Sequence, residues 1–208
     1  MHSLTKYIGG HGTSIGGIVV DGGNFDWTKN RKRQPLLNEP DQSYGGAVWI
    51  DAVHQLTGAN IPFVIRLRVV LLRDTGAPLA PFNAWQIIQG LETVGLRMKQ
   101  HCSNAEKVVT FLETQKKVQN VIYPTNHQGE IKERAKKYMQ GGYGSLVGMD
   151  VGTKENGAKF IDNLKMLYHV ANIGDARSLA IHQATTTHSQ LNEKELLAAG
   201  VTPGYVRL

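Results

Sequence analysis

The feature that most constrains the fold of this chain is a long apolar stripe in its middle. Apolar side chains recur at steps of three and four residues, at Ile87, Leu91, Val94, Met98, Cys102, Ala105, Val108 and Leu112. This spacing predicts one continuous α-helix that begins near Asn83, after Pro78 and Pro81. A helix of this length is unusual inside a globular domain and often bridges two domains. Gly90 and Gly95 are the positions at which it can bend.

The composition is that of a soluble globular protein. Of the 208 residues, 41% are hydrophobic and 19% are charged. No apolar run approaches the ~20 residues that span a bilayer, and the N-terminus lacks the apolar core of a signal peptide. The single cysteine, Cys102, excludes an internal disulfide and fits a reducing compartment. We therefore expect a cytoplasmic protein without a membrane partner, in which Cys102 is a core residue rather than a nucleophile.

The net charge is +6, from 23 basic and 17 acidic residues. The densest basic cluster is Lys29-Asn30-Arg31-Lys32-Arg33, which is short and has no interleaved aromatic residues. This pattern is typical of a solvated loop rather than a nucleic-acid-binding surface, so no nucleic-acid partner is expected. The basic excess suits an anionic substrate or a phosphate-bearing cofactor, although charge alone does not establish either.

Before the stripe, the sequence predicts little regular structure. Residues 14–20 are apolar and β-branched and are followed by the turn Asp21-Gly22-Gly23-Asn24, which predicts a buried strand. Residues 25–60 are rich in Gly, Pro, Asn and charge, and are interpreted as a long functional or subunit-contacting loop. Residues 61–72 fit either a helix or a strand.

After the stripe, short strands alternate with helices, which predicts a small α/β domain. Strands are expected at 118–123, 145–151 and 179–181, and another begins at 205. One helix face is marked by Ala158, Ile161, Leu164 and Tyr168. The last helix has a capping box, Asn192 with Glu195, and Gly200 stops it.

The first residues of the chain carry the strongest chemical signal. Lys6 follows two hydroxyl residues, Ser3 and Thr5, and precedes a glycine-rich turn at 9–12. Hydroxyls and free backbone N–H groups can hold phosphate oxygens, and a lysine amine can condense with a carbonyl. Taken alone, the same pattern also fits an ordinary solvated lysine beside a turn.

Several motifs along the chain resemble one known family. They begin with Ser3-Leu4-Thr5-Lys6-Tyr7 and Gly10-His11-Gly12, and continue at 71–76, 81–84, 89–93, 172–176 and 204–208. In this order they resemble the C-terminal half of the pyridoxal-phosphate (PLP) enzymes of cysteine and methionine metabolism. That family belongs to the fold type I, trans-sulfuration group and includes cystathionine γ-synthase and methionine γ-lyase. The matches span essentially the whole sequence.

Within the family, the chain is most similar to the O-acetylhomoserine sulfhydrylases. The similarity lies at 9–17, at 21–27 and at 197–203. This resemblance implies a PLP-dependent γ-replacement that makes homocysteine and acetate from O-acetylhomoserine and sulfide, in methionine and cysteine biosynthesis. Cystathionine γ-synthase, cystathionine γ-lyase or methionine γ-lyase chemistry stays open, as does a vestigial, non-catalytic fragment.

The resemblance also implies roles for individual residues. Lys6 would form a Schiff base with PLP and then move protons at Cα and Cβ of the substrate. Ser3 and Thr5 would bind the cofactor phosphate. Arg207 would pair with the α-carboxylate of the amino-acid substrate, a role that suits the planar fork of guanidinium. Thr185 would place a hydroxyl close to that substrate.

The chain departs from the family pattern near residue 183. Family members usually carry His-Pro-Ala-Ser before a Thr-His pair, whereas this chain reads His182-Gln183-Ala184-Thr185-Thr186-Thr187-His188. Gln183 thus replaces a rigid turn proline. His182 and His188 have no Cys or acidic partners at metal-ligand spacing, so no metal site is expected.

The implied architecture is an α/β remnant of a fold type I PLP-dependent transferase. Residues 1–80 would be the end of the large cofactor domain, 81–117 a long bridging helix, and 118–208 a small C-terminal α/β domain without its last strand and helix. In the family, the glycine loop, the stacking aromatic and the aspartate on the pyridinium nitrogen all lie before the lysine. In this sequence only five residues precede Lys6. We therefore expect the chain alone to be weakly active or inactive. The resemblance also implies a homo-oligomer, a dimer or a tetramer, for the full-length family.

Overall fold

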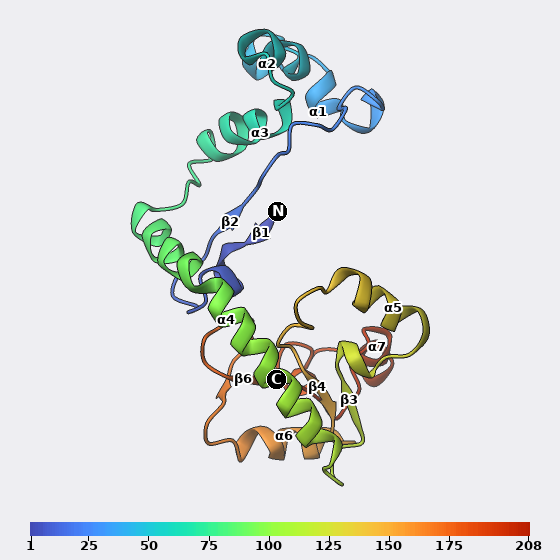
Figure 1. Cartoon of the computed structure of the whole chain (residues 1–208). Helices are drawn as coiled ribbons and strands as arrows, with labels where there is room; N and C mark the ends of the chain where they lie inside the picture. The colour runs from blue at the N-terminus through green and yellow to red at the C-terminus, as the bar shows by residue number, and fades with distance from the viewer. The chain divides into compact units, whose positions relative to one another are not determined.

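The computed structural model describes residues 1–208, which form two compact units. The helical unit consists of Met1–Ser3 and Gly16–Ala84, and the sheet unit of Leu4–Ile15 and Trp85–Leu208. The helices are α1 (Pro35–Asn38), α2 (Trp49–Thr57), α3 (Pro62–Arg66), α4 (Pro81–Glu113), α5 (Gly129–Tyr138), α6 (Lys154–Asp162) and α7 (Glu193–Ala198) (Figure 1). The strands are β1 (His2–Ser3), β2 (Gly17–Ile18), β3 (Asn120–Ile122), β4 (Gly148–Asp150), β5 (Tyr168–His169), β6 (Leu179–His182) and β7 (Tyr205–Arg207).

The helical unit has a small core of its own, formed by Leu37, Trp49 and Val53. The indole nitrogen of Trp49 donates a 2.9 Å hydrogen bond to the carboxylate of Asp41. The prediction of a long loop at 25–60 was therefore wrong, because its scattered aromatic residues pack around α1 and α2. The ambiguous segment that follows is helical, in α3 and a π-helical stretch at Leu67–Arg73.

The buried strand predicted at 14–20 is reduced to the two residues of β2, which pair antiparallel with β1. Ile15 is 80% exposed and Val20 is 71% exposed. β1 offers only two residues for pairing, and β-branched residues form a buried strand only where a partner surface covers them. The apolar composition of this segment therefore did not predict its burial.

The sheet unit is built on five strands in the order β3-β4-β7-β6-β5. All neighbours pair antiparallel except β5 and β6, which are parallel. Met149 lies opposite both Val121 and Val206, and Met149 and Val206 are fully buried. The strands predicted around these residues are confirmed. The last of them, β7, lies in the middle of the sheet.

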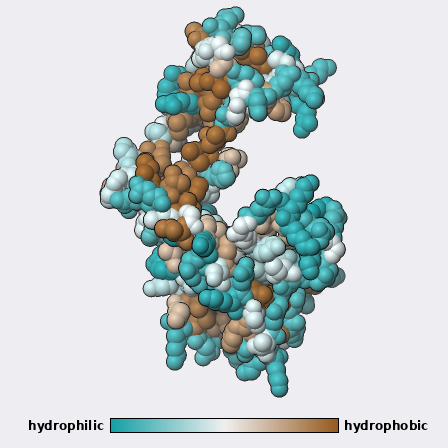
Figure 2. All heavy atoms as spheres, in the orientation of Figure 1, coloured by the Kyte–Doolittle hydropathy of each residue, from teal (hydrophilic) through white to brown (hydrophobic).

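Helix α4 runs unbroken through both glycines, as one helix from Pro81 to Glu113. Its C-terminal half packs on the sheet through Ala105, Val109 and Leu112. The predicted stripe is only partly covered, because Leu91 is 52% exposed and Val108 is 38% exposed. Apolar residues stay exposed on the first half of the helix, and brown atoms gather where α4 begins in Figure 2.

Two of the shorter helices in the sheet unit, α6 and α7, begin at side-chain caps. Helix α6 is capped by the Thr153 side chain and ends at Asp162, so Tyr168 lies in β5 and not on the helix face predicted for it. Helix α7 begins with the predicted capping box between Asn192 and Glu195, in which each residue bonds the other's backbone N–H. Gly200 follows it with φ +75°, a left-handed conformation that glycine adopts at helix ends.

No single helix has both the length and the apolar character needed to cross a membrane. Only the bent pair of Trp49–Thr57 and Pro62–Arg73 reaches that length and composition when its two members are taken together.

Candidate functional site

The lysine loop, defined here as residues 4–12, folds back on itself around Lys6. Lys6 has non-helical backbone angles, φ −88° and ψ −130°, within the π-helical turn. The backbone N–H of Gly9 donates to the carbonyl oxygen of Leu4 (2.9 Å), and the N–H of Gly10 donates to the carbonyl oxygen of Lys6 (2.8 Å). Gly10 has φ +74°, a conformation that favours glycine over any residue with a Cβ. The glycine-rich turn therefore fixes the direction in which the chain leaves the lysine.

Residues 172–177 pack directly on this loop. A Cβ placed on Gly174 would lie 2.5 Å from the backbone nitrogen of Tyr7, so only glycine fits there. The backbone N–H of Ala176 donates a 2.7 Å hydrogen bond to the carbonyl oxygen of Gly10. The two segments are thus joined backbone to backbone, which holds Lys6 at a defined position in the sheet unit.

Lys6 and Arg207 both contact Asn172. The Lys6 amine, which is partly buried, donates a 2.7 Å hydrogen bond to Oδ1 of Asn172. A guanidinium nitrogen of Arg207 donates to the backbone carbonyl oxygen of Asn172 at 3.2 Å. Strand alternation explains the direction of Arg207, because its neighbour Val206 is in the core and successive side chains point to opposite faces. One residue thereby accepts hydrogen bonds from both an amine and a guanidinium.

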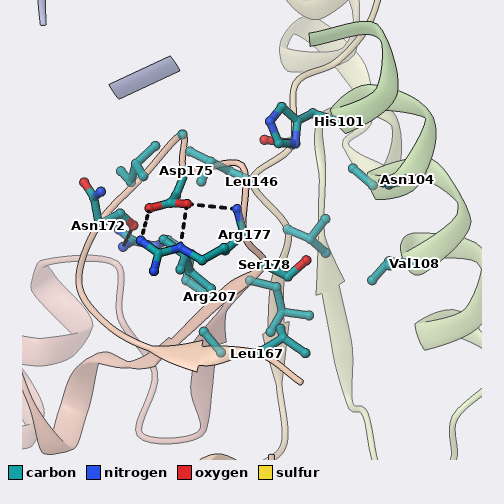
Figure 3. Close-up of a pocket in the computed structure, with 18 of the residues that line it drawn as sticks. His101, Asn104, Val108, Leu146, Leu167, Asn172, Asp175, Arg177, Ser178 and Arg207 are labelled. Carbon is teal, nitrogen blue, oxygen red and sulfur yellow. Dashed lines mark hydrogen bonds and ion pairs between the residues drawn. The ribbon is translucent and has the colours of Figure 1, made fainter. Parts of the chain in front are cut away.

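An ion pair lies next to Asn172. Arg177 donates to both carboxylate oxygens of Asp175, at 3.1 and 2.9 Å, as the dashed lines in Figure 3 show. Asp175 is 7% exposed. The hydrogen bond from Arg177 lowers the pKa of the Asp175 carboxyl, against the opposing effect of burial. The Arg177 guanidinium also lies over the ring of Tyr168, 5.1 Å from its centroid.

A cavity of about 560 Å³ opens between α4 and the segment that contains this ion pair. Its walls are mostly apolar, with Val108 of α4 facing Leu146 and Leu167 (Figure 3). The hydroxyls of Tyr7 and Ser145, which lie 2.7 Å apart, add a polar edge. The volume is within the range of small-molecule sites, about 300–1,000 Å³.

His101 lies on the α4 side of this cavity, with its ring edge-on to Tyr7 and the centroids 6.0 Å apart. Burial, followed by the positive charge of Arg97, lowers the pKa of His101. Both causes favour a neutral imidazole. Its Nε2 atom is buried without a hydrogen-bond partner.

The remaining predicted site residues lie in different surroundings. Ser3 is an exposed residue of β1 in the helical unit. Thr5 lines a second cavity of about 10 Å³, which has room for roughly one water molecule. Thr185 donates to the carbonyl oxygen of His182 at 3.3 Å, and its hydroxyl lies 2.9 Å from Nδ1 of the same residue. It is not among the residues that line the large cavity.

His182, for which the sequence predicted no role in a metal site, is fully buried. Its Nε2 lies 2.8 Å from the carbonyl oxygen of Pro203. A Cβ placed on Gly157 would lie 2.3 Å from the same nitrogen, so α6 packs tightly on the imidazole. No group of three or more His, Cys, Asp or Glu side chains is placed to hold a metal ion.

Sequence reasoning missed two residues that contact the lysine loop. Asn172 opens one of the motifs that carry the resemblance, but no role was assigned to it. Arg97 lies in α4 and donates to the carbonyl oxygen of Ile8 at 3.1 Å. The only available signal for Arg97 was a charged side chain one position before the apolar stripe residue Met98.

Comparison with known proteins places the chain in a family. The family of Cys/Met metabolism PLP-dependent enzymes matches residues 1–208. The chain belongs to this family. This confirms the resemblance read from the motifs around Lys6 and Asn172, and also the α/β fold class.

Relatives that match this chain include sulfhydrylases and homocysteine synthases. The O-acetyl-L-homoserine sulfhydrylase of Leptospira meyeri is 48% identical over 213 residues, which covers 100% of this chain and 48% of the relative. The homocysteine synthase of Schizosaccharomyces pombe is 42% identical over 208 residues, covering 100% of this chain and 47% of the relative. The chain therefore spans about half the length of the curated relatives it matches.

A solved structure of the family shows the same fold. The crystal structure of a putative O-acetylhomoserine (thiol)-lyase from Campylobacter jejuni matches with a TM-score of 0.87 and 39% identity. The match covers 99% of this chain and 48% of that one. The Campylobacter protein carries N'-pyridoxyl-lysine-5'-monophosphate, which is a lysine covalently joined to the cofactor.

Proposed function

We propose that Lys6 is the PLP-binding lysine of an O-acetylhomoserine sulfhydrylase. The reaction would replace the acetate of O-acetylhomoserine with sulfide to give homocysteine. One observation carries the proposal: the Lys6 amine and the Arg207 guanidinium both contact Asn172. An α-amino acid presents an amine and a carboxylate on adjacent carbons, so its site requires a covalent partner for the first and a cation for the second, close together.

The residues of this chain fit a PLP site at its amino-acid end. Lys6 is partly buried and its amine is directed by Asn172, whereas a purely surface lysine has no such fixed acceptor. Binding of the cofactor phosphate by Ser3 and Thr5 is part of the proposal and rests on the resemblance alone. Likewise, the proposed contact between Thr185 and substrate rests on its place in the matched segment.

PLP, when bound, supplies an electron sink that stabilises negative charge on substrate carbons. Lys6 then supplies the amine that accepts the Cα proton of the substrate and returns protons to its carbon chain. Arg207 holds the α-carboxylate with two parallel hydrogen bonds, which fixes Cα relative to that amine. The Oδ1 atom of Asn172 accepts from the Lys6 amine and so directs its lone pair. Sulfide comes from solution as a substrate, and the single cysteine, Cys102, is not among the residues that line the large cavity.

Reductive trapping tests the cofactor proposal. The purified 208-residue protein is mixed with PLP, reduced with borohydride and digested, and the pyridoxyl-lysine is mapped by mass spectrometry. Lys6 is expected to carry most of the adduct, and Lys6→Ala is expected to abolish that peak. Lys194→Ala, which removes an exposed lysine of α7, serves as the matched control and is expected to leave the Lys6 peak unchanged. Equal labelling of all exposed lysines, with none preferred, would refute the assignment.

Substrate assays separate sulfhydrylation from the related reactions. Because the chain spans about half the length of its relatives, the assay is run on the chain alone and on the chain co-expressed with the unmatched half of the Leptospira meyeri relative. Homocysteine is expected from O-acetylhomoserine and sulfide, with far less product from O-succinylhomoserine, from cysteine as the nucleophile, or from methionine cleavage. A homo-oligomer in the cytoplasm, as in the family, is also proposed, and light scattering coupled to size exclusion tests the assembly.

A further inference from the structure

Helix α4 lies so close to the lysine loop at Gly90 that only glycine fits at this position of the helix. A Cβ placed on Gly90 would lie 2.2 Å from the carbonyl oxygen of Gly9 and 2.6 Å from that of Ile8. Real Cβ atoms do not approach backbone oxygens so closely. Gly90 therefore lets the helix backbone lie directly against the two residues that follow the turn around Lys6.

Two turns further along α4, Arg97 spans this contact. One of its terminal nitrogens, Nη2, donates to the carbonyl oxygens of Gly90 (2.7 Å) and Ile8 (3.1 Å). Its Nε donates to the hydroxyl of Thr93 at 3.1 Å. The guanidinium also lies against Gly10, where an added Cβ would be 2.3 Å from Nη1. A single cation thus bonds the helix and the lysine loop together.

The energetics of Arg97 are unusual for a residue that serves stability alone. Its Nη1 atom is buried without a hydrogen-bond partner, and no carboxylate forms an ion pair with it. Arg97 is partly buried, its oxygen partners are all neutral, and a guanidinium nitrogen that is buried without a partner is costly. The benefit of Arg97 must then lie in what it holds in place.

From these contacts we propose that Arg97 is a positioning residue for Lys6. Arg97 fixes the carbonyl of Ile8, two residues after Lys6. Residues 172–177 fix the same loop through separate contacts with Gly10 and Tyr7. With the backbone held on both sides, the Lys6 amine keeps its direction toward Asn172. This inference rests on the proposed function of Lys6 as the PLP-binding lysine. The forked guanidinium suits this role, because Nη2 donates to the carbonyl oxygens of Gly90 and Ile8 while Nε donates to the hydroxyl of Thr93.

The test uses the full 208-residue protein in four forms: wild type, Arg97→Met, Arg97→Lys and the matched control Arg134→Met. Arg134 is an exposed arginine of α5 that pairs only with Glu130. Amide hydrogen exchange is followed by mass spectrometry for the lysine loop, where Gly9 and Gly10 donate backbone hydrogen bonds, and for β4 in the core. Borohydride trapping of PLP on Lys6 and thermal unfolding are measured on the same samples.

In Arg97→Met the loop amides are expected to exchange on the order of tenfold faster while β4 is unchanged. Trapping on Lys6 is expected to fall on the order of tenfold, because a misplaced reactive group loses its effective concentration. The Tm is expected to change by less than about 4 °C. Arg97→Lys is expected to recover part of the loop protection, and Arg134→Met to match the wild type.

Unchanged loop protection in Arg97→Met, or a parallel loss of protection in β4, overturns the proposal. Gly90→Ala provides an independent variant, because its methyl group must displace the Ile8–Gly9 backbone and is expected to expose the same amides. Failure of the proposed function is separately visible. If the wild type shows no preferred trapping on Lys6, that function fails, while the exchange measurements still decide whether Arg97 orders the loop.

Discussion

The amine of Lys6 donates a 2.7 Å hydrogen bond to the side-chain oxygen of Asn172, a residue 166 positions further along the chain. The backbone carbonyl of the same asparagine accepts a hydrogen bond from Arg207. Asn172 therefore connects the start, the late loop and the last strand of the sheet unit. Its side chain and its backbone serve two different cationic groups, so substitutions can separate the two roles.

Replacing Asn172 by alanine is expected to lower borohydride-trapped PLP on Lys6 by about tenfold, because the amine loses the acceptor that directs it. Asn172→Asp is expected to lower trapping further, since a carboxylate favours the charged form of the amine, and that form is not nucleophilic. The control is Asn163→Ala, an amide at the end of α6 that bonds the carbonyl oxygen of Lys159. Trapping in Asn172→Ala equal to that in the wild type would show that the hydrogen bond does not matter to the chemistry.

Gly174 offers a test of the backbone contact next to this pair. Gly174→Ala introduces both an unfavourable left-handed conformation (φ +79°) and a methyl group 2.5 Å from the nitrogen of Tyr7. Gly200→Ala has the same kind of backbone cost at φ +75°, but nothing lies within 4 Å of its Cβ. We expect Gly200→Ala to cost about 1 kcal/mol and Gly174→Ala clearly more, by chemical denaturation. Equal costs would mean that the loop yields to the methyl group without loss.

Features that are encoded locally could be predicted from the sequence. Helix α4 and the α7 capping box follow from residues a few positions apart, and both are confirmed. Lys6 was singled out by its immediate neighbours, the hydroxyls and the glycine turn. Its contact with Asn172 could not be predicted in this way, because it depends on how the chain returns after 166 residues.

Other errors arose where burial depends on distant partners. Val108 carries the correct helical period, but in α4 it faces the large cavity and is partly exposed. In the segment at 25–60, Trp49 and its neighbours have no clear period, yet they form the core of the helical unit. Periodicity reports which side chains share a face, whereas packing decides whether anything covers that face.

The sheet unit is expected to depend strongly on Met149. This side chain is fully buried on β4 between Val121 of β3 and Val206 of β7, so Met149→Ala leaves a cavity in the core. The free energy of unfolding is expected to fall by about 2–5 kcal/mol in urea titrations. Ile15→Ala, at a residue that is 80% exposed, is expected to change it by less than about 0.5 kcal/mol. A small effect at Met149 would contradict the tight packing of this core.

The ion pair between Asp175 and Arg177 is expected to make stability depend on pH below about 4. Hydrogen bonds and positive charge from Arg177, with a further contribution from His11, lower the pKa of the Asp175 carboxyl in the folded protein. An unfolded aspartate titrates near a pKa of about 3.9. The stabilisation is therefore fully present above that pH and is lost as the pH falls through the lower folded pKa.

Asp175→Asn removes this contribution at every pH, so the Tm of the wild type should exceed that of the variant by a constant amount above about pH 5. The difference should shrink steadily as the pH falls below about 4. Asp162→Asn, at an exposed position at the end of α6, controls for the general effect of losing one carboxylate. A difference between wild type and Asp175→Asn that stays constant under acid conditions would show that the carboxylate of Asp175 gains nothing from Arg177.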